Sequence, residues 1–458
     1  HLFLSSTDRK FYIHQKIYYQ KIKDKMKIIQ KNWYLLMVLS ICFAQEVLPL
    51  TERYFHSKDM GYDYSRGTYL IVLADASLES LLREEDTGDF IHFKKTQGYN
   101  VHIVDINDIS INKNALRQYL SLYYETDPLL EYVLLVGDVD AGSSFRIPAY
   151  QVASYSYPEL DITDHKYTYF DDDPLSPKFF IGRWPIRTED ELKKIKSRSI
   201  GYVTMHIPGT PYSLEDAGID LSYLNNALMV AANYAGNDGP GAFYPVTPVW
   251  TSRWLMDELY NYGYSQVDTA FWTNLNPIDN YSISTAWNQG VGIVGYRGWG
   301  GGTGWANPDF RNPDLEDLVN NWKLPVVFSF VCNTGDFNRT GGDHCFAEKA
   351  ITVGSPDIPT GAVAVVGPSD KDTDTKFNNP MYGTIMDALL EERVPELAPA
   401  LHAGKQCLIK EFGDLLAPDI YGFDGTYAEF YHYVYNVLGD PSLPIWLGEP
   451  QNMIVNLN

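Results

Sequence analysis

The stretch PVVFSFVCNTGDF, Pro325–Phe337, decides how the rest of the chain is interpreted. Val326–Val331 is an apolar, β-rich run between a proline and a turn at Asn333, which predicts a buried strand. A single thiol, Cys332, stands at the carboxyl end of that strand, where open α/β sheets carry their sites. Cys332 is therefore a candidate nucleophile. The alternative is a structural cysteine, since free cysteine is among the most buried residue types.

Apolar runs of strand length alternate with amphipathic segments on both sides of this stretch. The other predicted strands are Thr68–Ala74, Asn100–Ile106, Tyr132–Val136, Phe179–Ile181, Ala227–Ala232, Gln266–Phe271, Gly292–Tyr296 and, as the last of the series, Ala362–Val366. Helical spacing occurs within Ser77–Thr96, Lys113–Glu125, Glu189–Tyr202, Trp250–Gly263, Thr285–Gln289 and Asp314–Trp322. This alternation predicts an α/β fold with mostly parallel sheets. No glycine-rich phosphate loop follows the first strand, so nucleotide binding has no support.

A glycine-rich stretch, Arg297–Trp305, directly follows the predicted strand Gly292–Tyr296. Glycines allow the backbone to approach a ligand closely. If Gly292–Tyr296 and Val326–Val331 pair in parallel, their carboxyl ends lie side by side. The glycine-rich stretch would then lie next to Cys332.

Length and charge narrow the function classes. The chain has 458 residues, with 36 Lys and Arg against 58 Asp and Glu, for a formal net charge of −22. This length allows roughly two to three domains. The acidic balance argues against a nucleic-acid partner, which would require a basic face.

The amino-terminal segment has the layout of a secretory signal peptide. Lysines near Met26 precede the apolar run Trp33–Ala44, which is short for a membrane span. We expect residues 1–25 to be translated upstream sequence and residues 26–44 to be a cleaved signal peptide, with no stable membrane span left after cleavage. The alternative is an uncleaved anchor.

Signal cleavage would remove Cys42 and leave three cysteines. An odd number means that at least one thiol is free or pairs with another molecule. A disulfide between Cys345 and Cys407 is one arrangement, which would leave Cys332 free. A free thiol in an exported protein favours a reactive cysteine.

Three adjacent aspartates, Asp171, Asp172 and Asp173, lie in the polar segment Asp161–Arg187. Carboxylate oxygens are the ligands that Ca²⁺ prefers. These aspartates are therefore weak candidates for a calcium site, and a solvated acidic turn is the more common alternative. We expect no cofactor to be required for function, and Ca²⁺ is the one ion for which the sequence offers candidate ligands.

Several pieces of the chain, in this order, resemble the gingipain-type cysteine peptidases of bacteria, family C25. They are YVLLVGD at Tyr132–Asp138, FFIGRWP at Phe179–Pro185, the glycine stretch from Tyr296, FVCNTGDFN at Phe330–Asn338, CFAE at Cys345–Glu348 and LGDPSLP at Leu438–Pro444. The resemblance covers about residues 68–447. It implies a caspase-like fold of two side-by-side, three-layer α/β subdomains, here 68–205 and 220–447. Residues 448–458 would then begin a truncated immunoglobulin-like module.

The resemblance also implies a reaction and a set of site residues. Cys332 matches the nucleophile, whose thiolate would attack a peptide carbonyl and form an acyl-enzyme that water hydrolyses. The backbone amides of Gly300 and Cys332 match the oxyanion donors. The implied substrate is a polypeptide, and the implied location is outside the bacterial cell or on its surface.

One position departs from the family pattern. Trp299 stands where the family has its catalytic histidine, and an indole cannot take a proton from a thiol. General-base catalysis contributes about 10²–10⁴-fold, so a substitute matters. His344 is the first candidate and His165 the second, each against the alternative of a structural histidine. A thiolate stabilised by Arg297 and local amides is a further option.

Substrate binding is assigned to two further residues. Trp299 lies in the glycine-rich stretch, and Asp164 lies in a segment comparable to the family's Asp-x-x-Tyr pattern, although an exposed loop aspartate is the more common role. Two functions follow from these residues. The first is a secreted cysteine endopeptidase acting through Cys332. The second is a catalytically silent domain that binds peptides or partner proteins.

Overall fold

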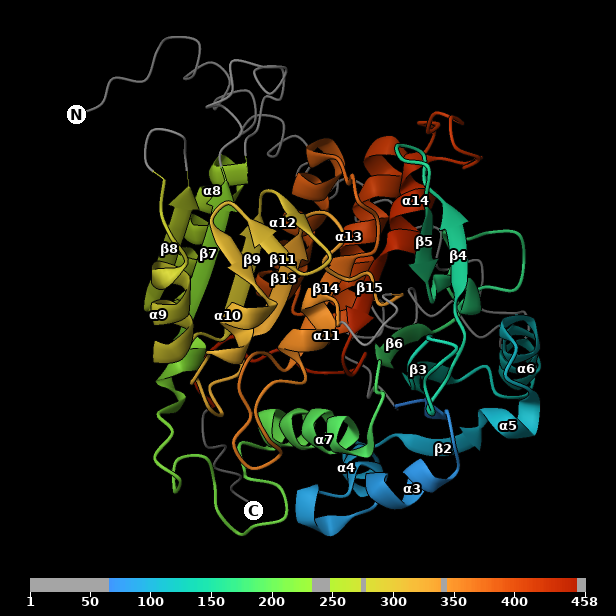
Figure 1. The fold of residues 1–458 in the computed structure, drawn as a ribbon, viewed down its shortest axis with the longest axis horizontal. Coiled ribbons are helices and arrows are strands. Elements are labelled where there is room, and N and C mark those ends of the chain that lie inside the picture. Colours follow the sequence, from blue (N-terminus) through green and yellow to red (C-terminus); the bar gives the residue numbers. More distant parts are fainter. Residues whose placement is uncertain (1–65, 233–247, 273–276, 339–343, 451–458) are drawn as a thin grey trace, which may run out of the picture. The chain divides into compact units, whose positions relative to one another are not determined.

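A computed structural model describes residues 66–232, 248–272, 277–338 and 344–450. Its main element is a ten-stranded sheet (Figure 1). In chain order the strands are β1 (Thr68–Leu73), β2 (Asn100–Asp105), β3 (Leu130–Val136), β6 (Phe180–Trp184), β7 (Asn226–Ala232), β8 (Gln266–Trp272), β9 (Ile293–Arg297), β13 (Val326–Phe330), β14 (Ala364–Pro368) and β15 (Tyr435–Leu438). Their order across the sheet is β2-β1-β3-β6-β15-β14-β13-β9-β7-β8.

The sheet consists of two parallel blocks that run in opposite directions. Strands β2, β1, β3, β6 and β15 are parallel to one another, as are β14, β13, β9, β7 and β8. The blocks join where β14 pairs with β15 in an antiparallel manner. The prediction of an α/β fold with mostly parallel strands is thus confirmed. Predicting Ala362–Val366 as the last strand was wrong, because β15 follows it and lies between the blocks.

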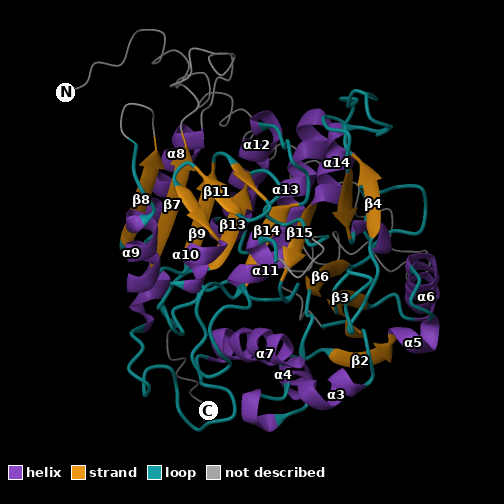
Figure 2. Ribbon diagram, in the orientation of Figure 1, coloured by secondary structure: helices purple, strands orange, loops and turns teal. Residues whose placement is uncertain are grey.

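Helices cover both faces of the sheet (Figure 2). They are α3 (Ser77–Leu82), α4 (Phe90–Thr96), α5 (Ile106–Ile109), α6 (Lys113–Thr126), α7 (Glu189–Thr204), α8 (Pro248–Tyr262), α9 (Tyr281–Gln289), α10 (Asn312–Glu316), α11 (Phe346–Ala350), α12 (Thr375–Leu390), α13 (Leu397–Phe412) and α14 (Tyr427–Val434). None of the described helices is long and apolar enough to cross a membrane. The predicted upstream segment and signal peptide, residues 1–44, lie outside the described residues, as does most of 448–458.

The strand before Cys332 shows how the layers are held together. Every residue of β13 is buried, and its side chains alternate between the two faces of the sheet. Phe330 stacks on Tyr382 of α12, with ring centroids 4.8 Å apart. The next side chain back, Ser329, accepts a hydrogen bond from the indole of Trp305 at 3.0 Å. One face of β13 therefore packs on helix α12, and the other packs on the loop region that follows β9.

Two predicted helices are shorter than their patterns suggest. Ser77–Thr96 divides into α3, a short 3₁₀ turn and α4, because Gly88 adopts φ +87° and Asp89 caps the new helix by accepting from the amide of His92. Asp314–Trp322 contributes only the end of the short helix α10. Asn321 there has φ +52°, which a continuous helix does not allow.

Two small sheets lie beside the main one. The first joins β10 (Gly300–Gly301), β11 (Gly304–Ala306) and β12 (Asp309–Arg311) in antiparallel order. The second is the hairpin of β4 (Tyr150–Ala153) and β5 (Leu160–Thr163). None of these five short strands was among the predicted strands.

Candidate active site

Cys332 lies just beyond the carboxyl end of β13, as predicted. β13 and β9 are parallel neighbours, with Phe330 in register with Arg297. The chains that leave these two strands therefore start side by side. Cys332 is partly exposed, and Asn333 after it adopts the left-handed conformation at φ +59°, which turns the chain sharply.

The glycine-rich chain after β9 packs directly on the residue before Cys332. A Cβ atom at Gly300 would lie 3.1 Å from Cγ2 of Val331, so a side chain there would crowd the turn. The hydroxyl of Tyr296 donates to the carbonyl of Trp299 at 2.6 Å, and its ring stacks on Trp305 at 4.4 Å. These contacts hold the backbone of Gly300 next to Val331, the residue before Cys332.

The turn after Cys332 is tied to the chain that leaves β14. The amide of Asn333 donates to the carbonyl of Asp370 at 2.7 Å, and its side-chain amide donates to the carbonyl of Ser369 at 2.9 Å. The amide of Gly335 donates to the carbonyl of Pro368 at 2.8 Å. A Cβ at Gly335 would lie 2.5 Å from the carbonyl oxygen of Gly367, so glycine is required for this close approach.

The surroundings of Cys332 favour the neutral thiol. Burial raises the pKa of Cys332 to about 12, and the carboxylates of Asp370 and Asp372 add to the increase. The backbone amide of Thr373 and the guanidinium of Arg297 act in the opposite direction but do not offset it. At neutral pH the thiolate, which is the nucleophilic form, is therefore scarce.

Trp299 lies on the surface of the glycine-rich loop. Its residue is 47% exposed, while its backbone is fixed by Tyr296. The indole N–H is a donor only, so Trp299 has no means of accepting the thiol proton. An exposed aromatic ring is instead suited to contact with a bound chain.

His344 is held by carboxylates from elsewhere in the fold. Its Nε2 lies 3.1 Å from Glu191 of α7, and its Nδ1 lies 4.0 Å from Glu348 of α11. Burial raises the pKa of Glu348 to about 8, although Arg187 lowers it. The charges that act most strongly on the pKa of Cys332 are those of Asp370, Asp372 and Arg297, and His344 is not among them. The role of His344 as a substitute base stays a prediction.

Asp164 is not an exposed loop residue, and that expectation was wrong. It is 3% exposed, and Arg183 of β6 binds both of its carboxylate oxygens at 2.7 Å. Arg183 also donates to the carbonyls of Gly137 and Ile147. The bidentate pair gives Asp164 a structural function, and its assignment to substrate binding stays a prediction.

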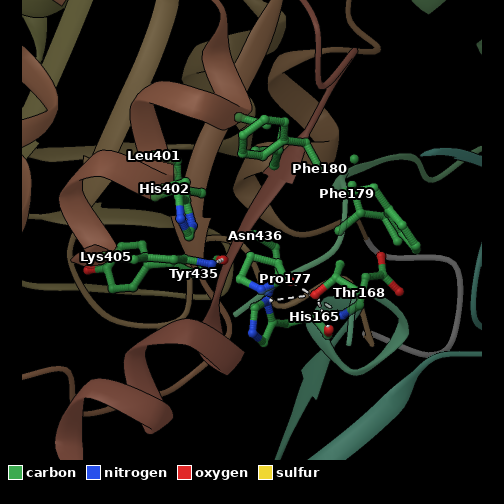
Figure 3. Close-up of a pocket in the computed structure, with 15 residues that line it drawn as sticks. His165, Thr168, Pro177, Phe179, Phe180, Leu401, His402, Lys405, Tyr435 and Asn436 are labelled. Carbon is green, nitrogen blue, oxygen red and sulfur yellow. Dashed lines mark hydrogen bonds between the residues drawn. The ribbon is translucent and has the colours of Figure 1, made fainter. Parts of the chain in front are cut away.

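His165 lines a pocket with a volume of about 50 Å³ (Figure 3). Its Nε2 lies 2.6 Å from the carbonyl of Pro174, and Figure 3 shows His402 and Lys405 on the α13 side of the same cavity. Burial lowers the pKa of His402 to about 3 and that of Lys405 to about 7, and it also lowers the pKa of His165. This cluster could not be predicted, because His165 lies more than 200 positions from His402 and Lys405.

Asp171, Asp172 and Asp173 are exposed. Asp171 pairs with Lys178 at 2.9 Å, and Asp173 accepts from the hydroxyl of Ser176 at 2.6 Å within its own turn. Each of these two carboxylates therefore has a bonding partner within seven residues of it in the chain. Another acidic group, consisting of Glu159, Asp161 and Asp370, brings its carboxylate oxygens together.

The three described cysteines, Cys332, Cys345 and Cys407, are all free. A disulfide between Cys345 and Cys407 was therefore a wrong expectation. Cys345 is buried at the start of α11, where its amide donates to Glu348 at 2.6 Å.

Comparison with known families decides the relationship. The model of "Peptidase family C25" matches residues 63–446. The chain belongs to peptidase family C25. Among curated C25 relatives, gingipain R2 and gingipain R1 of Porphyromonas gingivalis are each 27% identical over 379 residues, or 81% of this chain. The match covers 46% of gingipain R2 and 34% of gingipain R1, so the chain spans about half the length of these relatives or less.

Solved structures agree on the fold. The crystal structure of the Arg specific cysteine proteinase gingipain R superposes with a TM-score of 0.68 at 23% identity, covering 85% of this chain and 81% of that one. The complex of Porphyromonas gingivalis RgpB pro- and mature domains gives 0.67 at 23% identity, covering 84% and 81%. This C25 chain therefore has the caspase-like fold of the gingipains, as the resemblance predicted.

Proposed function

We propose that this C25 chain is an exported cysteine-type endopeptidase that cleaves polypeptides through Cys332. The observation that carries the proposal is the packing of Gly300 against Val331 at the carboxyl ends of β9 and β13. This packing supports the assignment of the Gly300 and Cys332 amides as oxyanion donors. The signal-peptide layout of residues 26–44 supports export to the medium or the cell surface.

The reaction requires the thiolate of Cys332. Its sulfur forms a bond to the carbonyl carbon of the substrate while the peptide C–N bond breaks, and the leaving amine takes the proton that the base has removed from the thiol. Water then hydrolyses the thioester and releases the second product. Backbone N–H groups that face the developing oxyanion would stabilise both steps.

Proton removal from the thiol is the weak step in this scheme. Trp299 cannot perform it, and the thiol pKa of about 12 leaves little thiolate without help. His344 is the proposed base, which would have to exchange its contact with Glu191 for one with the thiol. Arg297 supplies the charge that opposes Asp370 and Asp372 at the sulfur.

The same observations favour a second candidate function, a domain that binds peptides without cleaving them. A protonated Cys332 and an exposed Trp299 form a surface that holds a chain but does not attack it. The two functions differ in a single measurable property, the reactivity of the thiol.

Thiol alkylation across pH separates the two functions. The full chain is treated with iodoacetamide from pH 6 to 9, and the labelled peptides are quantified by mass spectrometry. Cys407 serves as the internal control, because burial raises its pKa as well and no function is assigned to it. A peptidase predicts that Cys332 reacts faster than Cys407 at pH 7, and that an arginyl peptide ketone labels it. Equal or slower reaction without a ketone adduct would rule out the peptidase and favour the binding domain.

Peptide cleavage gives the second test. Arginine substrates come first, because a solved relative is described as Arg specific. Cleavage that disappears in Cys332→Ala supports the proposal, and cleavage that persists in this variant contradicts it.

A further inference from the structure

Three basic side chains line the pocket shown in Figure 3, and a fourth packs against two of them. His402 and Lys405 belong to α13, and His165 lies across the pocket from them. The ring of His432 in α14 lies 5.5 Å from that of His165 and 6.2 Å from that of His402, measured between centroids. All four residues are at most 7% exposed. The fold therefore buries four bases together, and the proposed reaction uses none of them.

Two of the imidazoles have a buried nitrogen without a hydrogen-bond partner among the described residues. These atoms are Nε2 of His402 and Nε2 of His432. The Nδ1 of His432 lies 2.7 Å from the carbonyl of Ala428, which can only accept, so Nδ1 carries the proton of the neutral ring. Protonation turns Nε2 into a donor as well. A buried polar atom without a partner is costly, and a ligand that accepts hydrogen bonds would remove that cost.

The ammonium of Lys405 lacks a carboxylate partner within the described part of the chain. Burial shifts its pKa, and no acidic group opposes the shift. The ammonium instead donates to the carbonyls of His432 and Tyr435 at 2.9 and 2.8 Å, which leaves one of its three N–H groups for a ligand. Asp164 also lines the pocket, but Arg183 binds both of its carboxylate oxygens. The described side chains around the pocket therefore leave its positive charge without a counter-ion.

The four bases oppose one another's protonation. Lys405 acts on all three imidazoles, and His402 acts on His165 and His432. Burial lowers the pKa of His402 to about 3 and that of Lys405 to about 7, and the charge of Lys405 adds to the effect on His402. Without a counter-ion these groups resist protonation, and a bound anion would favour it.

We propose that this pocket binds a small inorganic anion of the size of chloride, which accepts hydrogen bonds from the ammonium of Lys405 and from Nε2 of His402. His165 and His432 surround these two donors. Residues of β6, β15 and α13 line the pocket together, so the anion stabilises the packing of α13 on these two strands. The site is separate from Cys332 and does not depend on the proposed function.

An anion suits the pocket better than a metal ion or a larger ligand. The ammonium of Lys405 repels cations, and these imidazoles are not among the described groups of three or more ligand atoms that lie within 4.8 Å of one another. A volume of about 50 Å³ exceeds the roughly 10–15 Å³ that one water molecule requires, but it is too small for a peptide. The formal net charge of −22 repels anions from the surface in general, so a saturable effect of chloride requires a specific site.

Anion binding and protonation favour each other at this site. Below about pH 7, Lys405 is charged before the anion arrives. Above that pH the anion must bind together with a proton, so its affinity falls by up to about tenfold per pH unit. We expect the Kd for chloride to be about tenfold lower at pH 6 than at pH 8.

Melting temperatures of the full chain in NaCl and in sodium gluconate, at equal ionic strength, test the binding. Gluconate is too large for the pocket, so NaCl should raise the melting temperature above the gluconate value until the site is saturated. Lys405→Met removes the ammonium and should abolish this difference between the salts. Lys410→Met is the matched control, an exposed lysine of the same helix that should leave the difference unchanged. His402→Gln should weaken the apparent affinity severalfold, and it decides the question if Lys405→Met fails to fold.

Equal melting temperatures in the two salts overturn the site, as does a difference that His402→Gln and Lys405→Met both retain. Stabilisation by ZnSO₄ that chloride does not reproduce overturns the anion in favour of a metal ion on the imidazoles.

Crystals grown in NaBr locate the ion through the anomalous scattering of bromide. A bromide within hydrogen-bond distance of Nζ of Lys405 supports the site. The absence of bromide from the pocket, at a concentration that saturates the effect on melting, overturns it. A bromide in the pocket without any effect of NaCl on melting is an adventitious ion only, and this result also overturns the proposal.

Discussion

Two groups of buried acidic side chains, both within the part of the chain that the structure describes, differ in what surrounds their charges. In the first block of the sheet, Asp164 is bound bidentately by Arg183, and Asp440 pairs with Lys94 at 2.5 Å. Beside Cys332, Asp161 and Asp370 face each other and Glu159 instead. There the lysine that reaches the cluster, Lys371, sits at the rim with half of its side chain in solvent.

The difference separates structural charge from functional charge. A buried ion pair with good geometry stabilises one conformation, and losing one partner is costly. A buried group of like charges stores unfavourable energy that an ion or a proton relieves. Four predictions test this contrast, starting with the largest expected effect.

Removing one partner of a buried ion pair in the first block should strongly lower the stability of the chain. Arg183→Met leaves Asp164 buried without its cation and also removes donors to two carbonyls. We expect the free energy of unfolding to fall by about 3–5 kcal/mol, measured by urea denaturation. The control is Arg83→Met, which breaks the exposed pair with Glu79 and should cost no more than about 0.5 kcal/mol. Equal losses in the two variants would contradict the contrast.

Adding a proton acceptor at position 299 should increase the alkylation rate of the Cys332 thiol. Trp299→His places an imidazole where the family resemblance assigns the base. We expect the alkylation rate of Cys332 at pH 7 to rise about 10²-fold, the lower end of general-base contributions. Trp299→Phe keeps an aromatic ring without an acceptor and should show no gain. If the two variants behave alike, position 299 is not within reach of the thiol.

Rising pH should lower the free energy of unfolding through the acidic group that contains Asp161. Burial and Asp370 raise the pKa of Asp161 to about 9, so the folded chain holds a proton that the unfolded chain releases near pH 4. Stability from this group is present at low pH and falls as the pH rises from about 4 toward 9, by up to about 1.4 kcal/mol per pH unit. Unfolding in EDTA across this range measures the slope. Asp161→Asn should reduce the slope, and an unchanged slope would show that the carboxylate does not hold a proton.

Acidic pH should lower the free energy of unfolding through a third set of residues, His165, His402 and Lys405, which line one pocket. Burial lowers the pKa of His402 to about 3, so below pH ~6.5 the unfolded chain binds a proton that the folded chain refuses. Stability falls as the pH drops from about 6.5 toward 3, again by up to about 1.4 kcal/mol per pH unit. His402→Phe should make melting temperatures between pH 4 and 6.5 less dependent on pH. If the dependence stays the same, His402 titrates normally.

Much of the fold could be predicted because its strands are continuous apolar runs. β1, β3, β7 and β13 are buried on both faces and bounded by polar or turn residues, which is the pattern of a parallel sheet. β15 was not predicted, because its four residues, YNVL, follow α14 without a break and contain the polar Asn436. No local signal separates the end of that helix from the strand.

The candidate site was only partly predictable for a different reason. Cys332 and Gly300 follow predicted strands, so strand pairing places them together. The cluster near Cys332 joins Asp161 to Asp370 across more than 200 positions, and the contact of His344 with Glu191 spans 153. Such contacts depend on how the two blocks meet, which one sequence does not reveal.

The place of β15 in the sheet has a consequence for synthesis. Among the strands that the structure describes it is the last in the chain, yet it lies in the middle of the sheet, pairing with β6 on one side and β14 on the other. Until Leu438 has emerged, the nascent chain carries two separate sheets with open edges at β6 and β14. Open edges of this kind invite pairing with other chains. The final part of translation therefore joins the two halves, and a chain that ends before Tyr435 would be exposed to aggregation at both edges.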